Sequence, residues 1–308
     1  MLPLHPTARS SAIKGRLRTP KSIRIRTGPA RRDPRFSPPA DGGRPENAVT
    51  GTLFMVNGPG QHSISVPSEE GRLRFWRHTD FALLAPGQIV QLAPHVLGYE
   101  WDVDMDNGCR PSGLFHLSST RVSVKTLLQD HGATYQAGDA THHLTLYRHA
   151  SGAWVFGAGT IQWSWGLDAI SDPTSNPDTR MQQATVNLLA DMGVQPATLR
   201  EGLIQAMPST DRTPPTSMLS MPSTALARAE DGSVTITGIA QDKAGRVAGV
   251  ELSTDHGATW HPAEGREHWQ FSWKPCCTWK VPVQSRAIDD SGNVEAFGNA
   301  VGVIVEPE

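Results

Sequence analysis

Short apolar runs broken by turn residues are the feature of this sequence that most constrains its fold. From Gly51 onward, runs with strand-like composition are separated by glycine- and proline-containing turns such as PGQ and EEG. In the first half we expect strands at 52–56, 63–66, 72–76, 88–92, 113–117, 121–127, 143–147 and 154–159. In the second half we expect strands at 233–242, 249–255, 269–273, 281–292 and 300–306. Turns recur about every ten residues in this second series, which predicts an all-β sandwich.

One segment has helical periodicity instead. Asn176 and Pro177 are suited to the N-cap and first helical position, and Gly193 is suited to a left-handed cap at the other end. Between them, apolar residues recur at helical spacing on one stripe, at Met181, Ala184, Leu188 and Met192. The pattern predicts one clear helix, with a shorter one over 197–206.

These patterns divide the 308 residues into four segments. Residues 1–50 contain 11 Lys/Arg and three acids, a net charge of +8, with little apolar periodicity. This composition predicts a disordered basic leader, either a solvated segment or one that binds phosphates. Residues 51–206 form the first folded region, 207–223 a Pro/Ser-rich linker, and 224–308 an all-β sandwich.

Several classes of protein are disfavoured by what the sequence lacks. The net charge of −2 provides no field that selects nucleic acid. Neither a secretory signal nor an apolar run of membrane-spanning length is present. The three cysteines, Cys109, Cys276 and Cys277, lack metal-site spacing, and no GxSxG, HExxH or phosphate-loop motif occurs. We therefore expect neither a nucleic-acid nor a membrane partner.

Three longer stretches carry a family resemblance: LGYEWDVDMDNGCRPSGLFHLSST (97–120), THHLTLYRHASGAWVFGAGTIQWSWGLD (141–168) and QQATVNLLADMGVQPATL (182–199). With GTLFMVNGPG (51–60) and RFWRHT (74–79), they resemble the C-terminal region of N,N-dimethylformamidase large-subunit-like proteins. Residues 247–293 are similar to the immunoglobulin-like (Ig-like) modules that follow this region in multidomain members. The STD-GATW motif within them also occurs in molybdenum-cofactor oxidoreductases.

The resemblance implies a metal-dependent amide hydrolase with mononuclear iron held by two tyrosines and a glutamate. Such an ion acts as a Lewis acid and activates bound water. Glu100 matches the family carboxylate, whereas the upstream HDEYW-like tyrosine segment has no counterpart, and only Tyr99, Tyr135 and Tyr147 are present. The implied fold is therefore mainly β with some α, an incomplete α/β-type domain followed by the sandwich. The implied product is a C-terminal fragment, inactive without an upstream domain or subunit, from a parent that resembles extracellular proteins.

Four acids alternate along one run: Glu100, Asp102, Asp104 and Asp106. On a strand, alternate residues share a face, so these carboxylates would repel one another and attract a cation or a basic partner. Three interpretations remain open: a turn with solvated acids, part of the family site with Asp102 as a catalytic helper, or a calcium loop. The calcium pattern is incomplete, because Asn107 occupies the glycine position and Gly113 the position of the bidentate glutamate.

His142 and His143 precede a strand and should face opposite sides of it, so at most one points into any site. The simpler interpretation is that they cap or pack; the functional one makes His143 a general base. The indoles of Trp163 and Trp165 would share one face of an extended segment and stack on a sugar or a small amide, or else anchor the core.

The remaining aromatic and turn residues suggest structure rather than chemistry. Four tryptophans are expected in the sandwich core: Trp260, Trp269, Trp273 and Trp279. Residues 289–293, DDSGN, are typical of a hairpin turn. Two functions therefore compete: an amide-hydrolase region completed by a partner, and a binding or structural module for a carbohydrate or partner domain.

Overall fold

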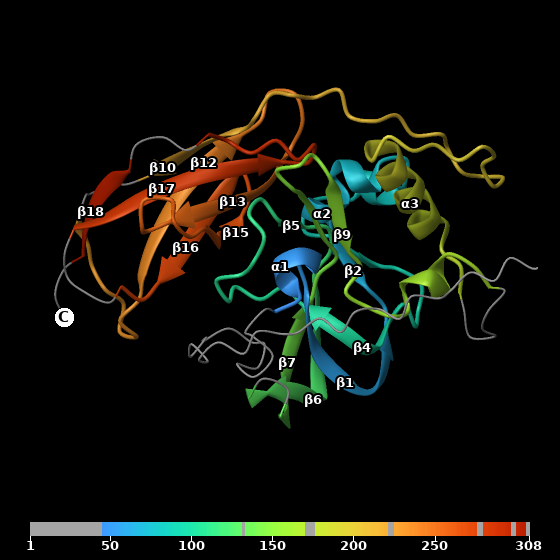
Figure 1. The fold of residues 1–308 in the computed structure, drawn as a ribbon, viewed down its shortest axis with the longest axis horizontal. Coiled ribbons are helices and arrows are strands. Elements are labelled where there is room, and N and C mark those ends of the chain that lie inside the picture. Colours follow the sequence, from blue (N-terminus) through green and yellow to red (C-terminus); the bar gives the residue numbers. More distant parts are fainter. Residues whose placement is uncertain are drawn as a thin grey trace, which may run out of the picture.

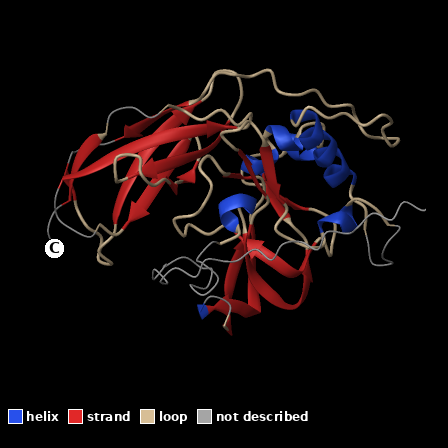
Figure 2. Ribbon diagram, in the orientation of Figure 1, coloured by secondary structure: helices blue, strands red, loops and turns tan. Residues whose placement is uncertain are grey.

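The structure, a computed structural model, describes residues 45–130, 133–169, 176–220, 225–275, 280–296 and 300–305. Two units lie side by side, a strand-rich first region and a β-sandwich (Figures 1 and 2). The expected class, mainly β with one clear helix and a C-terminal Ig-like sandwich, is confirmed. Most of the basic leader, Cys276, Cys277 and Trp279 lie outside the described residues.

The first region is built from three small sheets. Its elements are α1 (Asn47–Thr50), β1 (Leu53–His62), β2 (Ser65–Pro67), α2 (Ser68–Gly71), η2 (Arg74–Trp76), η3 (Asp80–Leu83), β3 (Ile89–Gln91), β4 (Leu97–Val103), β5 (Phe115–His116), β6 (Thr120–Gln129), β7 (Thr134–His142), β8 (Thr145–Arg148), β9 (Trp154–Gly157), η5 (Trp163–Gly166) and α3 (Thr179–Asp191). The strand orders are β4-β1-β6-β7, β5-β8-β9 and β2-β3, and all pairings within them are antiparallel. The loop after β9 covers the outer edge of β4 through a bridge between Trp101 and Thr160.

Three local expectations are wrong. Residues 72–76 form no strand, because Arg74–Trp76 is the 3₁₀ helix η2. This helix buries the adjacent side chains of Phe75 and Trp76 together, whereas a strand would direct them to opposite faces. Residues 197–206 contain no helix. Residues 47–50, placed in the leader, form α1, and Asn47 at its start is fully buried.

Helix α3 forms as expected, but it begins two residues later than its Asn-Pro signal. Asp178 is the N-cap, and its side chain accepts a hydrogen bond from the Arg180 amide. At the other end, Gly193 takes the expected left-handed conformation, with φ of 81°. Among the described residues, no helix is long and apolar enough to cross a membrane.

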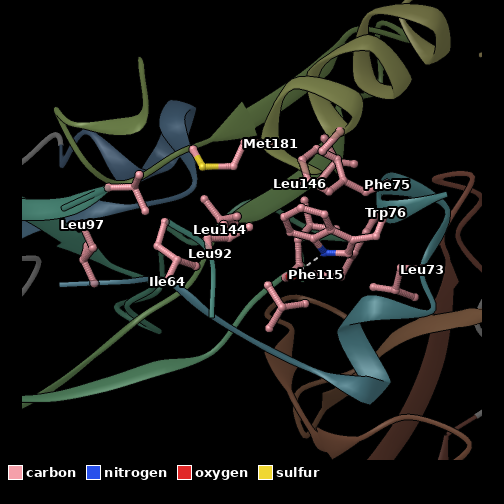
Figure 3. Close-up of a cluster of buried hydrophobic side chains, with 14 of the residues drawn as sticks. Ile64, Leu73, Phe75, Trp76, Leu92, Leu97, Phe115, Leu144, Leu146 and Met181 are labelled. Carbon is pink, nitrogen blue, oxygen red and sulfur yellow. Dashed lines mark hydrogen bonds between the residues drawn. The ribbon is translucent and has the colours of Figure 1, made fainter. Parts of the chain in front are cut away.

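The core of the first region lies between the small sheets and α3 (Figure 3). Trp76 is at its centre, fully buried, and its indole N–H donates to the Leu117 carbonyl at 2.8 Å. The rings of Phe75 and Phe81 contact Trp76 edge-on, at centroid distances of 4.8 and 4.9 Å. Met181 from α3 closes the cluster, so the helix is held by its apolar stripe.

The sandwich consists of two facing sheets. Its strands are β10 (Thr216–Ser220), β11 (Ala225–Leu226), β12 (Val234–Gln241), β13 (Val247–Ser253), β14 (His261–Pro262), β15 (Glu264–Gly265), β16 (His268–Trp273), β17 (Lys280–Asp289) and β18 (Val301–Val305). One sheet has the order β10-β12-β16-β15 and the other β11-β18-β17-β13-β14. Strand β10 falls within the expected linker, because residues 216–220 pair with β12, so the sandwich begins earlier than 224.

The expected tryptophans of the sandwich divide between core and surface roles. Trp269 is buried and Trp273 packs against the same cluster, as a core position requires. Trp260 instead lies beneath the guanidinium of Arg286, 3.9 Å from ring centroid to carbon, a cation–π contact. The expected turn after β17 is present, with Gly292 at φ of 75°.

Polar contacts join the two units. The Glu251 carboxylate of β13 accepts a hydrogen bond from the Gly113 amide of the first region at 2.9 Å. The Arg74 amide donates to Asp290 at 2.8 Å, and Val294 packs against the first region's apolar cluster. The sandwich is therefore docked on the first region rather than tethered by a linker alone.

Candidate functional site

The four alternating acids do not share a face. Glu100 and Asp102 lie on β4, and both line a pocket of about 330 Å³ between β4, Thr52 and the loop after β9. We call this the carboxylate pocket. Asp104 and Asp106 come after β4 has ended, and their side chains take different partners. The end of the strand therefore breaks the alternation on which a four-acid face depends.

Asp102 is the more perturbed acid of the carboxylate pocket. Burial raises the pKa of its carboxyl, and the hydrogen bond from the Thr52 hydroxyl, at 2.7 Å, opposes that rise only in part. Asp102 therefore holds its proton to a higher pH than a free aspartate does. A carboxyl of this kind, beside a second carboxylate in one pocket, is suited to proton transfer.

His143 lies in a different pocket. Its Nδ1 donates to the Ser118 carbonyl at 2.8 Å, so Nε2 carries the free lone pair. The ring stacks on that of His116, with centroids 3.6 Å apart and planes at 11°. Burial, followed by the charge of His116, holds the pKa of His143 well below its usual value, so the ring is neutral at pH 7.

His142 points away from this pocket, as neighbouring positions on a strand require. It is fully buried, and its Nε2 bonds to the Ala158 carbonyl at 2.9 Å. Burial lowers its pKa to about 4. His142 thus has the expected packing role.

His116 extends the cluster towards the sandwich. Its Nε2 bonds to Asp104 at 2.7 Å, and Arg110 binds the same carboxylate at 2.9 and 3.0 Å. Burial opposes ionisation of Asp104, yet the His116 hydrogen bond and the Arg110 charge lower its pKa to about 2. Asp104 is therefore a permanent anion that orients His116 beneath the ring of His143.

The His116–His143 stack forms part of the wall of a pocket between the two units, with a volume of about 920 Å³. We call it the interdomain pocket. The first region also contributes Glu70 and Arg110, and the sandwich contributes Arg266 among others. Both charge signs and a neutral imidazole therefore face one space, an arrangement suited to a small polar ligand.

The sequence indicated His143 as a general base and Asp104 as one of four alternating acids, but it did not predict that these two residues meet His116. Asp104 and His116 are 12 residues apart in sequence. They meet because Asp104 follows the end of β4 and His116 lies on β5, which the fold brings close to that end. The structure also separates His143 from Glu100 and Asp102, because the two pockets share no lining residue. Glu100, Asp102 and His143 therefore do not form one site.

Trp163 and Trp165 do not present a joint stacking face. They lie in the 3₁₀ helix η5 rather than in an extended segment, and residues two apart in such a helix point in different directions. Trp163 contacts Phe156 edge-on, with centroids 5.4 Å apart, at the margin of the core. This packing matches the alternative in which the indole anchors the core.

The residues around Glu100 do not fit the implied iron ligand set. Tyr99 is next to Glu100 on β4 and so faces the other side of the strand. The Tyr147 hydroxyl donates to the Val49 carbonyl at 2.7 Å. Only Tyr135 remains, so two tyrosines cannot join Glu100. Within the described part of the chain, Glu100 also belongs to no group of three His, Cys, Asp or Glu ligands.

The calcium-loop interpretation fails for a related reason. Asp102 is bonded to Thr52, Asp104 to Arg110 and His116, and Asp106 to His261 at 2.7 Å. Because each carboxylate has its own donor, the three do not converge on one centre.

Comparisons with known proteins complete the picture. No curated protein matches the chain. Among solved structures, the fibronectin(III)-like modules of Clostridium thermocellum CbhA match at 18% identity and a TM-score of 0.26, covering 30% of this chain and 97% of that one. The sulfane dehydrogenase SoxCD from Paracoccus pantotrophus matches at 14% identity and a TM-score of 0.24, covering 79% of this chain and 68% of that one.

A family model is more informative. The model described as N,N-dimethylformamidase beta subunit-like, C-terminal, matches residues 13–179. The match begins within the basic segment and ends at the start of α3, and it includes both pockets' residues on β4, β5 and the 142–161 stretch. By this match over more than half of its length, the chain belongs to the N,N-dimethylformamidase beta subunit-like, C-terminal family.

Proposed function

We propose that this chain is the C-terminal region of a metal-dependent amide hydrolase, and that its carboxylate pocket is completed by a partner segment or subunit. The observation that supports this most directly is the placement of Glu100 and Asp102 in one pocket. By the resemblance of its segment, Glu100 would be the family's metal-binding carboxylate, and membership of the family supports amide hydrolysis as the reaction class. The iron that the family implies needs two further ligands, which the partner would supply.

Within this proposal the two acids have different tasks. Glu100 is the ligand that the chain contributes. Asp102, whose pKa is raised by burial, exchanges a proton with a ligand in the pocket, and the Thr52 hydroxyl fixes the orientation of its carboxyl. A small amide would fit a pocket of about 330 Å³.

The test is elemental analysis for iron, together with hydrolysis of a small amide, by the chain alone and after co-expression with the upstream coding region. We expect iron and hydrolysis only in the co-expressed complex, and Glu100→Gln should remove both. Glu201→Gln, an exposed change in the same region, is the matched control and should remove neither. Stoichiometric iron in the lone chain, or iron that survives Glu100→Gln, would refute the proposed division of ligands.

A second candidate function is ligand binding without catalysis in the interdomain pocket. The observation that favours it is the His116–His143 stack, which leaves the Nε2 of His143 as an acceptor on the wall of the larger pocket. The ligand would be a carbohydrate or a small amide with an N–H group, because each can donate a hydrogen bond to this acceptor.

Calorimetric titration distinguishes this binding role from the first proposal. His143→Phe keeps an aromatic ring against His116 but removes the acceptor, so it should abolish binding of the small amide or sugar. Glu100→Gln should leave that binding unchanged, because Glu100 lines the other pocket. Binding that is lost with Glu100→Gln and kept with His143→Phe would assign the ligand to the carboxylate pocket instead.

A further inference from the structure

Three aspartates from separate segments meet at the junction between the first region and the sandwich. Asp211 lies in the segment that leads into β10, Asp242 directly follows β12, and Asp289 ends β17. One carboxylate oxygen from each lies within 4.8 Å of the other two. In the described part of the chain, this aspartate cluster is the one group of three His, Cys, Asp or Glu residues so close together.

Local turns hold two of these carboxylates in place. The Thr213 amide donates to Oδ1 of Asp211 at 2.8 Å, and the Ala244 amide donates to Oδ1 of Asp242 at 3.1 Å. In each residue the second oxygen, Oδ2, is then directed into the cluster. Both Oδ2 atoms are buried and have no hydrogen-bond donor. A buried carboxylate oxygen without a donor is unfavourable, so a bound cation would stabilise these two atoms.

A glycine leaves the space that such a cation would need. A Cβ at Gly245 would lie 2.9 Å from Oδ2 of Asp242, 3.1 Å from Oδ1 of Asp290 and 3.2 Å from Oδ2 of Asp211. Three carboxylate oxygens from three residues therefore surround one point that no side chain fills. Gly245 itself lies at the surface, so the point is close to the exterior of the protein.

Basic side chains lie near the cluster: burial raises the pKa of the neighbouring Asp290, and the charge of Arg74 opposes that rise. Among the described residues, however, no lysine or arginine forms an ion pair with the members of the cluster, and Arg74 and Arg77 on the wall of the adjoining pocket bind Asp191 instead. The negative charges repel one another as the structure stands.

We infer that the aspartate cluster, with Asp290, binds a calcium ion beside Gly245. Calcium accepts six to eight oxygen ligands at about 2.3–2.6 Å in flexible geometry, so carboxylates from several segments with added water suit it. Magnesium requires a tighter octahedron and keeps its own waters, so it fits this arrangement less well.

The position of the ion gives it a structural task that is independent of amide hydrolysis. Asp211 belongs to the connection between the two units, and Asp290 accepts a hydrogen bond from the Arg74 amide of the first region. An ion bound to both would fasten the connecting segment to the end of the sandwich and to the first region. Calcium would therefore stabilise the junction between the two units.

Equilibrium dialysis with radioactive calcium, on chain stripped with EDTA, tests the inference. We expect one calcium per chain with a Kd of about 1 mM or lower, and a higher Tm in the presence of calcium. Magnesium should bind at least about tenfold more weakly than calcium. Gly245→Ala keeps every charge but fills the space, and Asp242→Asn removes one ligand. Each should weaken calcium binding by about tenfold or more. Asp231→Asn, at an exposed carboxylate elsewhere on the sandwich, should bind calcium like the unaltered chain.

Melting in EDTA separates lost binding from lost folding. Without calcium, Asp242→Asn should be at least as stable as the unaltered chain, because a repelling charge is gone, yet its Tm should no longer rise when calcium is added. Calcium binding that is undetectable at about 5 mM, or that is unchanged in both Gly245→Ala and Asp242→Asn, would overturn the inference.

Discussion

Arg110 of the first region and Glu251 of the sandwich form an ion pair across the boundary between the two units, with Nη1 and Oε1 3.3 Å apart. Their side chains are only 3% and 2% exposed. Arg286 binds the other oxygen of Glu251 at 2.6 and 2.8 Å, and Arg110 in turn binds Asp104 beneath the histidine stack. One buried chain of charges therefore links the sandwich to the wall of the interdomain pocket.

Glu251→Gln should destabilise the protein strongly. It leaves Arg110 and Arg286 buried beside a neutral amide, and breaking a buried pair in this way lowers the free energy of unfolding by about 3–5 kcal/mol. Urea unfolding measures the change. Glu264→Gln, at an exposed position on β15, is the control and should change stability little. A loss under about 1 kcal/mol for Glu251→Gln would mean that water reaches the pair.

Asp104 should govern acid stability at the low end of the pH range. Its folded pKa of about 2 lies below the ordinary value of 3.8, so its stabilisation is complete above about pH 4 and lost as pH falls through 2. The difference corresponds to about 2 kcal/mol. Urea unfolding between pH 4 and pH 2 should therefore show a steeper loss for the unaltered chain than for Asp104→Asn; parallel curves would contradict the assignment.

His142 should govern stability in a higher pH window. Its folded pKa of about 4 lies below the ordinary 6.5, so the unfolded chain takes up the proton first. The neutral ring's contribution is complete above about pH 6.5 and is lost as pH falls towards 4, by about 3 kcal/mol. His143 is shifted in the same direction. His142→Gln, which keeps a donor for the Ala158 carbonyl, should flatten the stability curve in this window but not abolish its slope.

The Thr52 hydroxyl should set the proton affinity of Asp102. Thr52→Val removes the one hydrogen bond that lowers this pKa, so the carboxyl should titrate at higher pH than in the unaltered chain. Carbon-13 NMR of the labelled aspartates measures the shift. Thr52→Ser keeps the hydroxyl and should leave the Asp102 pKa near its starting value; an equal rise in both variants would point to burial as the whole cause.

Two glycines of the sandwich should differ in their tolerance of a methyl group. At Gly238 on β12, a Cβ would lie 2.0 Å from the Trp269 ring and 2.5 Å from the Met218 carbonyl oxygen. Gly238→Ala should therefore lower the free energy of unfolding by about 1–3 kcal/mol or more. At Gly249 on β13 the nearest atom, Cβ of Phe115, is 3.5 Å away. The free energy of unfolding of Gly249→Ala, measured by thermal melting, should be within about 0.5 kcal/mol of that of the unaltered chain.

The sequence predicted those parts of the fold that depend on local pattern. The alternation in 121–127 and 233–242 marked β6 and β12, because a strand with one buried face must alternate. Apolar spacing located α3, and motif density identified the family. Local pattern failed at residues 72–76, where Phe75 and Trp76 are buried together by a turn that only the surrounding core stabilises.

The candidate site was predictable in composition but not in arrangement. The sequence named Glu100, Asp102 and His143 as chemically capable, and it placed His142 and His143 on opposite sides, because these inferences follow from side-chain chemistry and strand geometry alone. It could not separate the acids into two pockets, because that depends on where β4 ends and which donors the neighbouring segments supply.

The sequence by itself thus determined most of the strands, the helix, the sandwich and the family, but it did not reveal β7 or β10. Tertiary structure alone decided that Asp104 pairs with His116 and Arg110, and that Asp211, Asp242 and Asp289 converge from positions up to 78 residues apart. The physical reason is range: backbone pattern is set by neighbours a few residues away. The partner of a buried charge is set by whichever segments the whole core brings within a few ångströms of it.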